Sequence, residues 1–452
     1  MLSDFRPVAI FLLLAPLIFV AYALLTPPFQ TFDENQHLYR TWQIASLKLT
    51  AERRGSQSGG ELPPGLAKAT IREIGSVVPQ GKRLVVVRPF SDIFRWNTPI
   101  GNEQSPIFYD FFGAAVYSPV GYVPQVVAVR IGEAFGLSVE WTLRVGRLFS
   151  CALCIGLIWW ALTLLPFGRW TMTIIALLPP TAAGAASFGQ DALVIGGGFL
   201  LTALGLKIAV DSRWSVRRFA IVAAAGIALT LSKFVYLPLI AVPVLPKPRS
   251  IALSRWLYPP LLIGFIAAIL LFAWMRINSH SIVQFLPTLP TVSEQVFWIG
   301  SHPLDYLAVI ARTYVRLVPV LWADLYRFGD STVPIGLSAA LAGAAALLLI
   351  MIHGDHQAVE LTRARRLWML VIVIVVAALI ATAIFVTFTR PGAPYIPSIQ
   401  GRYFLPVLPL ALIALMRRGS APSLPLMPAA LTLALIAQAA TLGTIIRTFY
   451  RF

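Results

Sequence analysis

The chain has 452 residues, of which 58% are hydrophobic and only 12% are charged. A soluble globular protein is about half apolar and about a quarter charged, so this composition excludes an ordinary soluble domain and indicates a polytopic membrane protein. The formal net charge of +17 does not indicate nucleic-acid binding, because membrane proteins concentrate Lys and Arg in their cytoplasmic loops.

Continuous apolar segments predict an all-α fold, a polytopic transmembrane helical bundle that forms one integral membrane domain over residues 1–452. A helix needs roughly 20 apolar residues to cross about 30 Å of hydrocarbon, whereas barrel strands are short and alternate in polarity. We interpret about eleven segments as spans, some of them short. They cover residues 7–26, 143–165, 170–187, 191–210, 217–232, 234–246, 256–275, 332–352, 367–388, 402–416 and 422–446.

The basic residues between these spans predict the orientation of the chain. With the N-terminus inside, every predicted cytoplasmic loop contains Lys or Arg, as the positive-inside rule requires. A register shifted by one span would place the same clusters outside. The predicted cytoplasmic loops hold Arg169, Arg213, Arg217, Arg218, Lys247, Arg249, Arg255, Arg363, Arg365, Arg366, Arg417 and Arg418.

Two large segments are then expected on the outer face, at residues 27–142 and 276–331. The first contains "SQSGGELPPG", which predicts a loose loop, and residues 113–137, which favour an amphipathic helix at the membrane interface. The second contains "SHPLDYLAVIARTYVRLVPVLWADLYRFG", a stretch rich in Arg and aromatic residues that is also typical of an interfacial helix.

Two adjacent acids follow directly on the first span, in the segment "TFDENQHLYR". Thr31 and Glu34 fit a capping box, in which Thr31 caps a helix and Glu34 bonds back. The competing interpretation is a functional site at Asp33 and Glu34, with His37 and Arg40 on the same helical face. Such an acidic pair can hold a divalent cation such as Mg²⁺ or Mn²⁺, or one acid can act as a general base.

Further polar residues are expected on the same outer face. Asp191 begins the fourth span, and Lys233 divides the two short spans 217–232 and 234–246. Taken singly, the acid is a helix cap and the cations are snorkelling anchors. Taken together they predict a pocket with acids for deprotonation and cations for phosphate, which Arg binds in a bidentate manner. The other candidate residues of this pocket are Gln400, Arg402, Tyr403, Arg144 and Arg147.

An ordered set of motifs carries a family resemblance. The motifs are "PPFQTFDENQHLYRTWQIA", "YSPVGYVPQ", "SFGQDALVIGGGFLL", "LTLSKFVYLPL", "YRFGDSTVPIG" and "QGRYFLPVLPL". In this order they resemble the bacterial multi-pass membrane proteins of the domain-of-unknown-function 2142 family. That family in turn resembles the GT-C superfamily of membrane glycosyltransferases.

The resemblance implies an inverting glycosyltransferase of the bacterial cytoplasmic membrane, with its active site facing outside. Its donor would be a polyprenyl-phosphate-linked sugar, and its acceptor a cell-envelope glycan or a lipid-linked acceptor. A divalent cation is used by some GT-C enzymes and not by others. The alternative from another class is a transporter or flippase of lipid-linked glycans, which would spread polar residues through the interiors of its spans. The catalytic residues that the resemblance implies are Asp33, Glu34 and Asp191, and Arg402 and Lys233 match its phosphate-binding cations. The other predicted substrate-binding residues come from the topology and the helical spacing, and are His37, Arg40, Gln400, Tyr403 and Arg144.

Overall fold

The computed structural model describes residues 6–74, 87–95, 97–101, 104–244, 251–284, 289–326, 336–353, 361–390, 392–416 and 426–452. Four of the expected loop cations lie outside these ranges, namely Lys247, Arg249, Arg417 and Arg418. Most of the motif "YRFGDSTVPIG" also lies outside the described residues.

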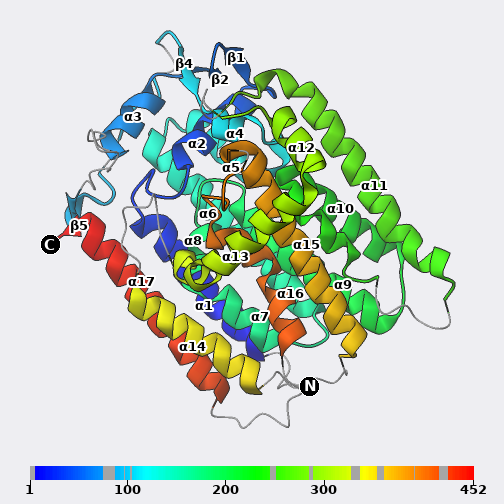
Figure 1. Ribbon diagram of the computed structural model, residues 1–452. Coiled ribbons are helices and arrows are strands. Elements are labelled where there is room, and N and C mark those ends of the chain that lie inside the picture. Colours follow the sequence, from blue (N-terminus) through cyan, green and yellow to red (C-terminus); the bar gives the residue numbers. More distant parts are fainter. Residues whose placement is uncertain are drawn as a thin grey trace.

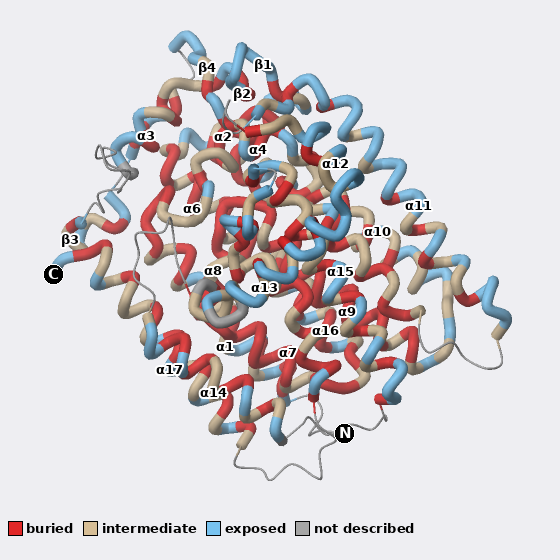
Figure 2. The backbone as a smooth tube through the Cα atoms, in the orientation of Figure 1, coloured by how far each residue is buried: buried red, intermediate tan, exposed pale blue. Residues whose placement is uncertain are grey.

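Six helices of the described chain are long and apolar enough to cross a membrane, and they confirm the predicted all-α polytopic bundle (Figure 1). One of them, α9, is the most enclosed, because 83% of its most apolar stretch is buried (Figure 2). It packs against α6 on one side and α10 on another. The six helices are α1 (Arg6–Leu25), α6 (Val139–Leu164), α9 (Asp191–Asp211), α11 (Leu253–Ile277), α15 (Arg363–Phe388) and α17 (Leu426–Phe449).

Three predicted spans are broken rather than continuous. Proline is the physical reason, since it removes a backbone donor and clashes with the preceding helical turn. Pro179, Pro238 and Pro406 lie at or within the broken segments. Broken helices are tolerated at membrane depth where protein buries them. The broken segments are α7 (Arg169–Ala176) with α8 (Pro179–Ala185), the 3-10 helix η4 (Phe234–Ala241), and η6 (Gly401–Val407) with α16 (Leu408–Leu415).

The remaining two predicted spans form shorter helices, α10 (Val216–Ser232) and α14 (Leu337–His353). Helix α10 ends at Ser232 and η4 begins at Phe234, so the predicted break at Lys233 is confirmed. The stretch predicted as a short span at 234–246 begins as a 3-10 helix of eight residues.

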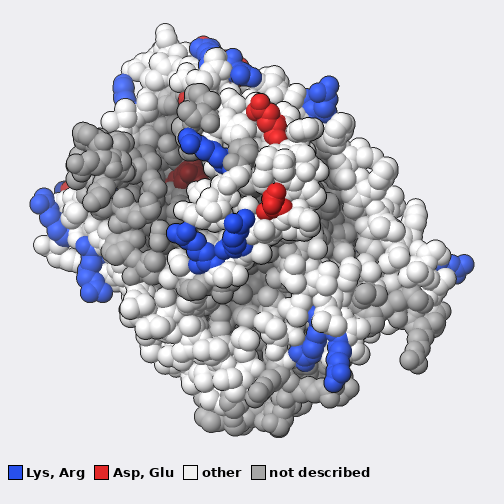
Figure 3. Space-filling view, in the orientation of Figure 1, with Lys and Arg blue, Asp and Glu red and all other residues white. Residues whose placement is uncertain are grey.

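The described basic residues of the predicted cytoplasmic loops gather at one end of the bundle. Arg365 at the start of α15 donates to Ala209 O in the last turn of α9, and Arg366 donates to Ala414 O at the end of α16. Thr173 of α7 reaches Pro7 O at the start of α1. The loops predicted on one side of the membrane therefore share one end of the fold, which also holds the start of α1 (Figure 1). On the face in Figure 3, charged side chains leave wide stretches of uncharged surface between them.

The opposite end of the bundle carries the long segment after α1. A three-stranded antiparallel sheet forms there, with Leu62 paired to Ile107 and Gly59 paired to Asp110. The prediction of a loose loop at "SQSGGELPPG" is wrong, because β2 pairs with a strand more than 40 residues further along the chain, a partner that no local pattern indicates. The elements are α2 (Glu34–Ala45), β1 (Glu52–Arg54), β2 (Gln57–Leu62), α3 (Gly65–Ile74), β3 (Arg88–Pro89), η2 (Phe90–Asp92), β4 (Ile107–Asp110), α4 (Phe112–Ala115), η3 (Pro119–Tyr122) and α5 (Val123–Ala134).

The segment at 276–331, predicted on the outer face, contains helices in its described residues. The Tyr306 and Tyr314 hydroxyl groups bond Thr382 and Ala377 O of α15, so α13 packs along that span. The elements here are η5 (Ser279–Ser281), α12 (Val292–Ser301) and α13 (Pro303–Leu325). At the C-terminal end, β5 (Tyr450–Arg451) pairs with β3 in parallel.

Candidate functional site

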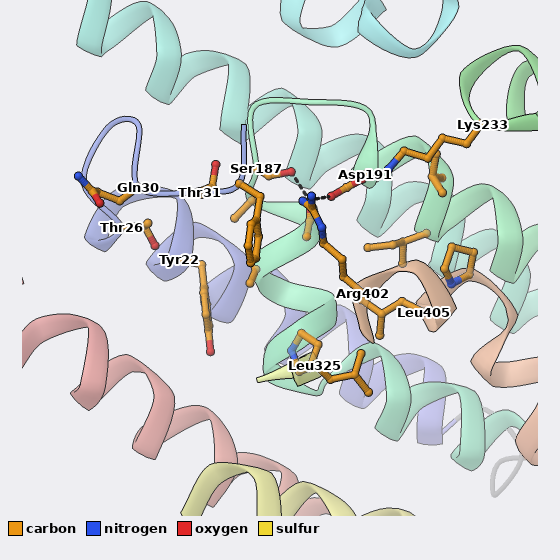
Figure 4. A pocket seen from close by; sticks show the side chains of 18 of the residues that line it. Tyr22, Thr26, Gln30, Thr31, Ser187, Asp191, Lys233, Leu325, Arg402 and Leu405 are labelled. Carbon is orange, nitrogen blue, oxygen red and sulfur yellow. Dashed lines mark hydrogen bonds and ion pairs between the residues drawn. The ribbon is translucent and has the colours of Figure 1, made fainter. Parts of the chain in front are cut away.

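Four charged side chains from four separate segments meet at the end of the bundle that carries the outer segments. Arg402 lies at the centre, with Nη1 3.3 Å from Asp191 Oδ2 and Nη2 3.4 Å from Asp33 Oδ2. Lys233 Nζ donates to Asp191 Oδ1 at 2.7 Å (Figure 4). We call Asp33, Asp191, Lys233 and Arg402 the charged cluster. The sequence predicted all four as site residues, and the structure brings them together.

Each member of the charged cluster lies where a helix begins, ends or breaks. Asp191 is the first residue of α9, where the partial positive charge of the helix N-terminus favours a carboxylate. Lys233 follows the last residue of α10, where the partial negative charge favours a cation. Arg402 lies in the 3-10 turn η6, and Asp33 directly precedes α2. The charged side chains of this site therefore come from residues at the ends and breaks of helices.

Two close backbone approaches hold η6 in place. A Cβ added at Gly198 of α9 would lie 2.5 Å from Pro406 O, and one added at Gly401 would lie 2.5 Å from Leu321 O of α13. Both separations are far shorter than a normal carbon–oxygen contact, so only glycine fits at either position. The two glycines thus fix Arg402 between α9 and α13.

Replacing Gly401 by alanine is expected to lower the melting temperature of the purified protein by several degrees. The added methyl group forces the backbones of η6 and α13 apart, and such overpacking costs about 1–3 kcal/mol. The matched control is Gly264→Ala in α11, where nothing lies within 4 Å of the added Cβ. Thermal unfolding of both variants in detergent checks the prediction, and equal melting temperatures would contradict it.

Aromatic and amide side chains surround the Arg402 guanidinium. Its Nε donates to Gln400 Oε1 at 2.6 Å, and its Cζ lies 4.2 Å from the centroid of the Phe32 ring. The Tyr403 ring lies 5.5 Å from the Arg402 guanidinium and 5.8 Å from Lys233 Nζ. Gln400 and Tyr403, both predicted as site residues, therefore lie beside the charged cluster. They hold the guanidinium in a single orientation toward the two acids.

His37 of α2 lies next to the charged cluster and is held by two tyrosines. Its Nδ1 is 2.7 Å from the Tyr122 hydroxyl, and its ring stacks on Tyr117 at a centroid distance of 6.1 Å. Burial lowers the pKa of His37 to about 4, against the opposing effect of the Asp33 and Asp191 carboxylates. The imidazole is therefore neutral at pH 7 and is available as a hydrogen-bonding group rather than as a cation.

Two cavities meet at the charged cluster, and Asp191, Lys233, Tyr236 and Arg402 line both. The larger has a volume of about 440 Å³. Its polar side is formed by Asp33, His37 and Gln400, and its apolar side by residues of α15 such as Ile384 and Phe388. The smaller, of about 60 Å³, runs between α1, α8, α9 and η6 (Figure 4). The cluster thus faces a cavity that offers charge on one side and hydrocarbon on the other.

Glu34 was predicted as a catalytic acid or a helix cap, and the structure places it in neither position. Its carboxylate is fully buried against Arg147 and lines neither cavity. The capping box is wrong, because the N-cap of α2 is Asp33 and the Thr31 hydroxyl bonds no group among the described residues. Asp33 and Glu34 are consecutive residues, which point in different directions, so they do not form an acidic pair.

Arg40 and Arg144 also lie away from the two cavities. Arg40 is fully buried and donates to Gln43 Oε1, to Leu49 O at 2.6 Å and to Tyr117 O at 3.0 Å, so it ties the outer segment together. Arg144 is buried as well, donates to Ile93 O and lies 5.1 Å from the Trp141 ring. The structure does not bring either arginine to the charged cluster.

The acids of this site do not fit a divalent cation. Glu34 is engaged by Arg147, Asp191 is flanked by Lys233 and Arg402, and Asp33 faces Arg402. Carboxylates that bind Ca²⁺ or Mg²⁺ direct their oxygens at the ion, and here those oxygens are directed at basic side chains that would compete with it. Within the described residues, no three His, Cys, Asp or Glu side chains are grouped so that they could hold a metal ion.

The sequence interpretation missed four aromatic residues of the site, namely Phe32, Tyr117, Tyr122 and Tyr236. The two tyrosines that hold His37 both belong to the motif "YSPVGYVPQ", and Phe32 belongs to "TFDE". Their membership of these motifs is therefore a sequence signal that could have identified the three residues as part of the site. Tyr236 Oη donates to Tyr403 O at 2.8 Å, a contact 167 residues apart in sequence that no local pattern indicates.

Comparison with known proteins gives one finding. A family described as "Predicted membrane protein (DUF2142)" matches residues 15–411, which include every residue of the charged cluster. No curated protein and no solved structure matches the chain. The match covers well over half of the sequence, and the described helices agree with a multi-pass protein embedded in a lipid bilayer. The chain therefore belongs to the DUF2142 family of predicted membrane proteins.

Proposed function

We propose that this protein is an inverting membrane glycosyltransferase that takes a sugar from a polyprenyl-phosphate-linked donor and transfers it to a hydroxyl group of a cell-envelope or lipid-linked glycan. One observation carries the proposal. Two cations and two acids line one side of a 440 Å³ cavity, and the apolar end of a membrane-spanning helix lines the other side. A ligand with an anionic phosphate, a polar sugar and a hydrocarbon chain matches each part of this cavity.

The proposed reaction assigns a role to each member of the charged cluster. The acceptor oxygen attacks the anomeric carbon as the bond from that carbon to the phosphate oxygen breaks, and the configuration inverts. The hydroxyl proton goes to a carboxylate, and the phosphate leaves with the bonding electron pair. Arg402 and Lys233 stabilise the charge that develops on the leaving phosphate. Asp191 holds these two cations in place through its contacts of 3.3 and 2.7 Å.

Asp33 is the acid best suited to accept the proton. Its side chain is 61% exposed and its ion pair with Arg402 is 3.4 Å long, whereas the side chain of Asp191 is 18% exposed and is paired with two cations. A general base must reach the substrate hydroxyl before its basicity matters. We therefore assign the base to Asp33, with His37 as a neutral hydrogen-bonding neighbour.

The orientation in the membrane is part of the proposal. The charged cluster lies at the end of the bundle opposite the described basic loops, which the positive-inside rule places in the cytoplasm. We accordingly place the site on the outer face of a bacterial cytoplasmic membrane. Reporter fusions after Ser58 and Ser212 test this placement, since the first should report an outer location and the second an inner one.

The experiment that tests the proposed function uses purified protein in sealed proteoliposomes. The donor is a polyprenyl-phosphate-linked hexose labelled in the sugar, and the acceptor is a pool of lipid-linked glycans. Transfer of label to the acceptor, with release of polyprenyl phosphate, is the expected result. Label that crosses the bilayer while still attached to its lipid, without any transfer, would overturn the proposal and favour a transporter of lipid-linked glycans.

Removal of divalent cations is expected to change the transfer rate by less than about twofold. The reason is that Lys233 and Arg402 already supply the positive charge that a metal ion would bring to the phosphate. Transfer is measured after treatment with excess EDTA and again after addition of Mg²⁺ or Mn²⁺. Loss of transfer with EDTA and its recovery with either cation would contradict this assignment.

A further inference from the structure

Glu34 and Arg147 form an ion pair in the interior of the protein, beside the site but outside its cavities. Both side chains have no exposed surface. Arg147 Nε and Nη2 lie 2.7 and 2.6 Å from the two carboxylate oxygens of Glu34, so the contact is bidentate. The desolvation of two buried charges is repaid only when their geometry is good and additional hydrogen bonds satisfy their remaining groups.

The remaining bonds of the pair are to backbone groups of two chain segments that carry site residues. Arg147 donates to Thr26 O at 2.5 Å and to Pro27 O at 3.0 Å, at the end of α1. Glu34 accepts from Phe29 N at 2.8 Å and from Phe188 N at 3.2 Å. The pair therefore ties the turn between α1 and α2 to the loop that leads into α9.

The turn that the pair holds is strained. Phe29 has φ 63° and Asp33 has φ 54°, in the left-handed region that a bulky side chain such as phenylalanine rarely adopts. Conformations of this kind persist only when the surrounding structure enforces them, and they cluster at functional sites. Asp33 immediately precedes Glu34 in the chain, and Phe188 lies three residues before Asp191. The carboxylate of Glu34 thus controls the backbone on both sides of the charged cluster.

We infer that the Glu34–Arg147 pair is a positioning device that sets where Asp33 and Asp191 stand around Arg402. The catalytic consequence rests on the proposed function, whereas the control of the backbone rests on the contacts alone. The hydrogen bonds of the two side chains go to each other and to backbone groups, so the pair acts on the charged cluster through the backbone. The two side chains bond different backbone groups: Glu34 accepts hydrogen bonds from amides, and Arg147 donates hydrogen bonds to carbonyls.

The test separates positioning from simple support of the fold. Glu34→Asp keeps the charge and shortens the side chain by one carbon, so the protein should fold while the turn shifts. We expect kcat for transfer to fall at least tenfold with KM for the donor changed less than threefold. The matched control is Glu140→Asp. Glu140 is also fully buried and accepts from Thr98 N at 2.9 Å, but it does not hold the turn or the loop of the charged cluster.

Hydrogen–deuterium exchange gives a second measurement that needs no activity. Peptides covering residues 26–34 and 187–191 should exchange at least tenfold faster in Glu34→Asp than in the wild-type protein, and should be unchanged in Glu140→Asp. Wild-type exchange and wild-type kcat in Glu34→Asp would overturn the inference. If the wild-type protein shows no transfer, the proposed function fails, and the exchange rates alone decide whether the pair controls both segments.

A double variant guards against a folding defect. Glu34→Gln combined with Arg147→Met removes both charges, which a folded protein tolerates better than the loss of one partner. We expect the double variant to have a higher melting temperature than Glu34→Gln or Arg147→Met alone. It should still show fast hydrogen–deuterium exchange in both peptides. A double variant that regains both the wild-type melting temperature and the wild-type kcat would show that the pair only supports the fold.

Discussion

Replacing Arg402 by alanine is expected to lower kcat/KM for sugar transfer by about 10³-fold or more. Removing one donor that stabilises developing negative charge costs about 10²- to 10³-fold in comparable sites. Arg402 has a second role, because it lies 3.3 Å from Asp191 and 3.4 Å from Asp33. Without it the two acids repel an anionic substrate, so binding is weakened as well. The lost stabilisation of charge and the weaker binding both lower kcat/KM.

Arg402→Lys distinguishes charge from geometry. Lysine keeps the positive charge but cannot reach both acids and the Gln400 amide together, since it is a point charge rather than a planar fork. We expect it to recover binding of polyprenyl phosphate but only a small part of the rate. The control is Arg312→Ala in α13, an arginine whose Nε bonds Ala308 O of its own helix and which lines neither cavity. Initial rates over a range of donor concentrations check the prediction, and wild-type kcat/KM in Arg402→Ala would contradict it.

The sequence was informative about the ends of helices. Asp191, Lys233 and Arg402 each lie at a start or break of an apolar segment, and the topology predicts that these ends share one face of the membrane. Their meeting in space follows from that shared face and from the short distances between neighbouring spans. A topology read from apolar length and basic loops can therefore bring site residues together without any knowledge of packing.

The failures have the same physical origin, which is that local patterns do not specify distant partners. Glu34 adjoins a site acid in sequence, yet its partner is Arg147, 113 residues away in the second predicted span. Arg40 has the helical spacing of a site residue, but the carbonyl groups of Leu49 and Tyr117 bury it in the outer segment. A charged residue near a membrane has two stable environments, a solvated site or a hydrogen-bonded interior, and spacing alone does not separate them.

The sequence also did not predict which of the apolar runs form continuous helices. The apolar runs at 170–187, 234–246 and 402–416 satisfy hydropathy, yet the described residues of none of the three form one continuous α-helix. A proline lowers the apolar character of a segment very little, whereas it changes the backbone strongly. The interruption at η6 matters chemically, because Arg402 lies in this 3-10 turn and lines the cavity.

Replacing Asp33 by asparagine is expected to reduce kcat for transfer by about 10²- to 10⁴-fold, the range attributed to general acid–base catalysis. The amide has the same shape as the carboxylate but cannot take the acceptor proton. Asparagine also tolerates the left-handed backbone that Asp33 adopts at φ 54°, so the turn and the α2 helix should stay intact. Polyprenyl phosphate should therefore bind to Asp33→Asn within a few-fold of the wild-type affinity, since Lys233 and Arg402 are unchanged.

The loss of rate without loss of binding is what separates a base from a structural acid at this position. The matched control is Asp305→Asn, an exposed acid in the first turn of α13 that lines neither cavity. Rates and binding of polyprenyl phosphate are measured on the same preparations of both variants. A wild-type kcat in Asp33→Asn, together with a large loss in Asp191→Asn, would move the base to Asp191. That outcome would require Asp191 to act as base while bonded to two cations, which the exposed position of Asp33 argues against.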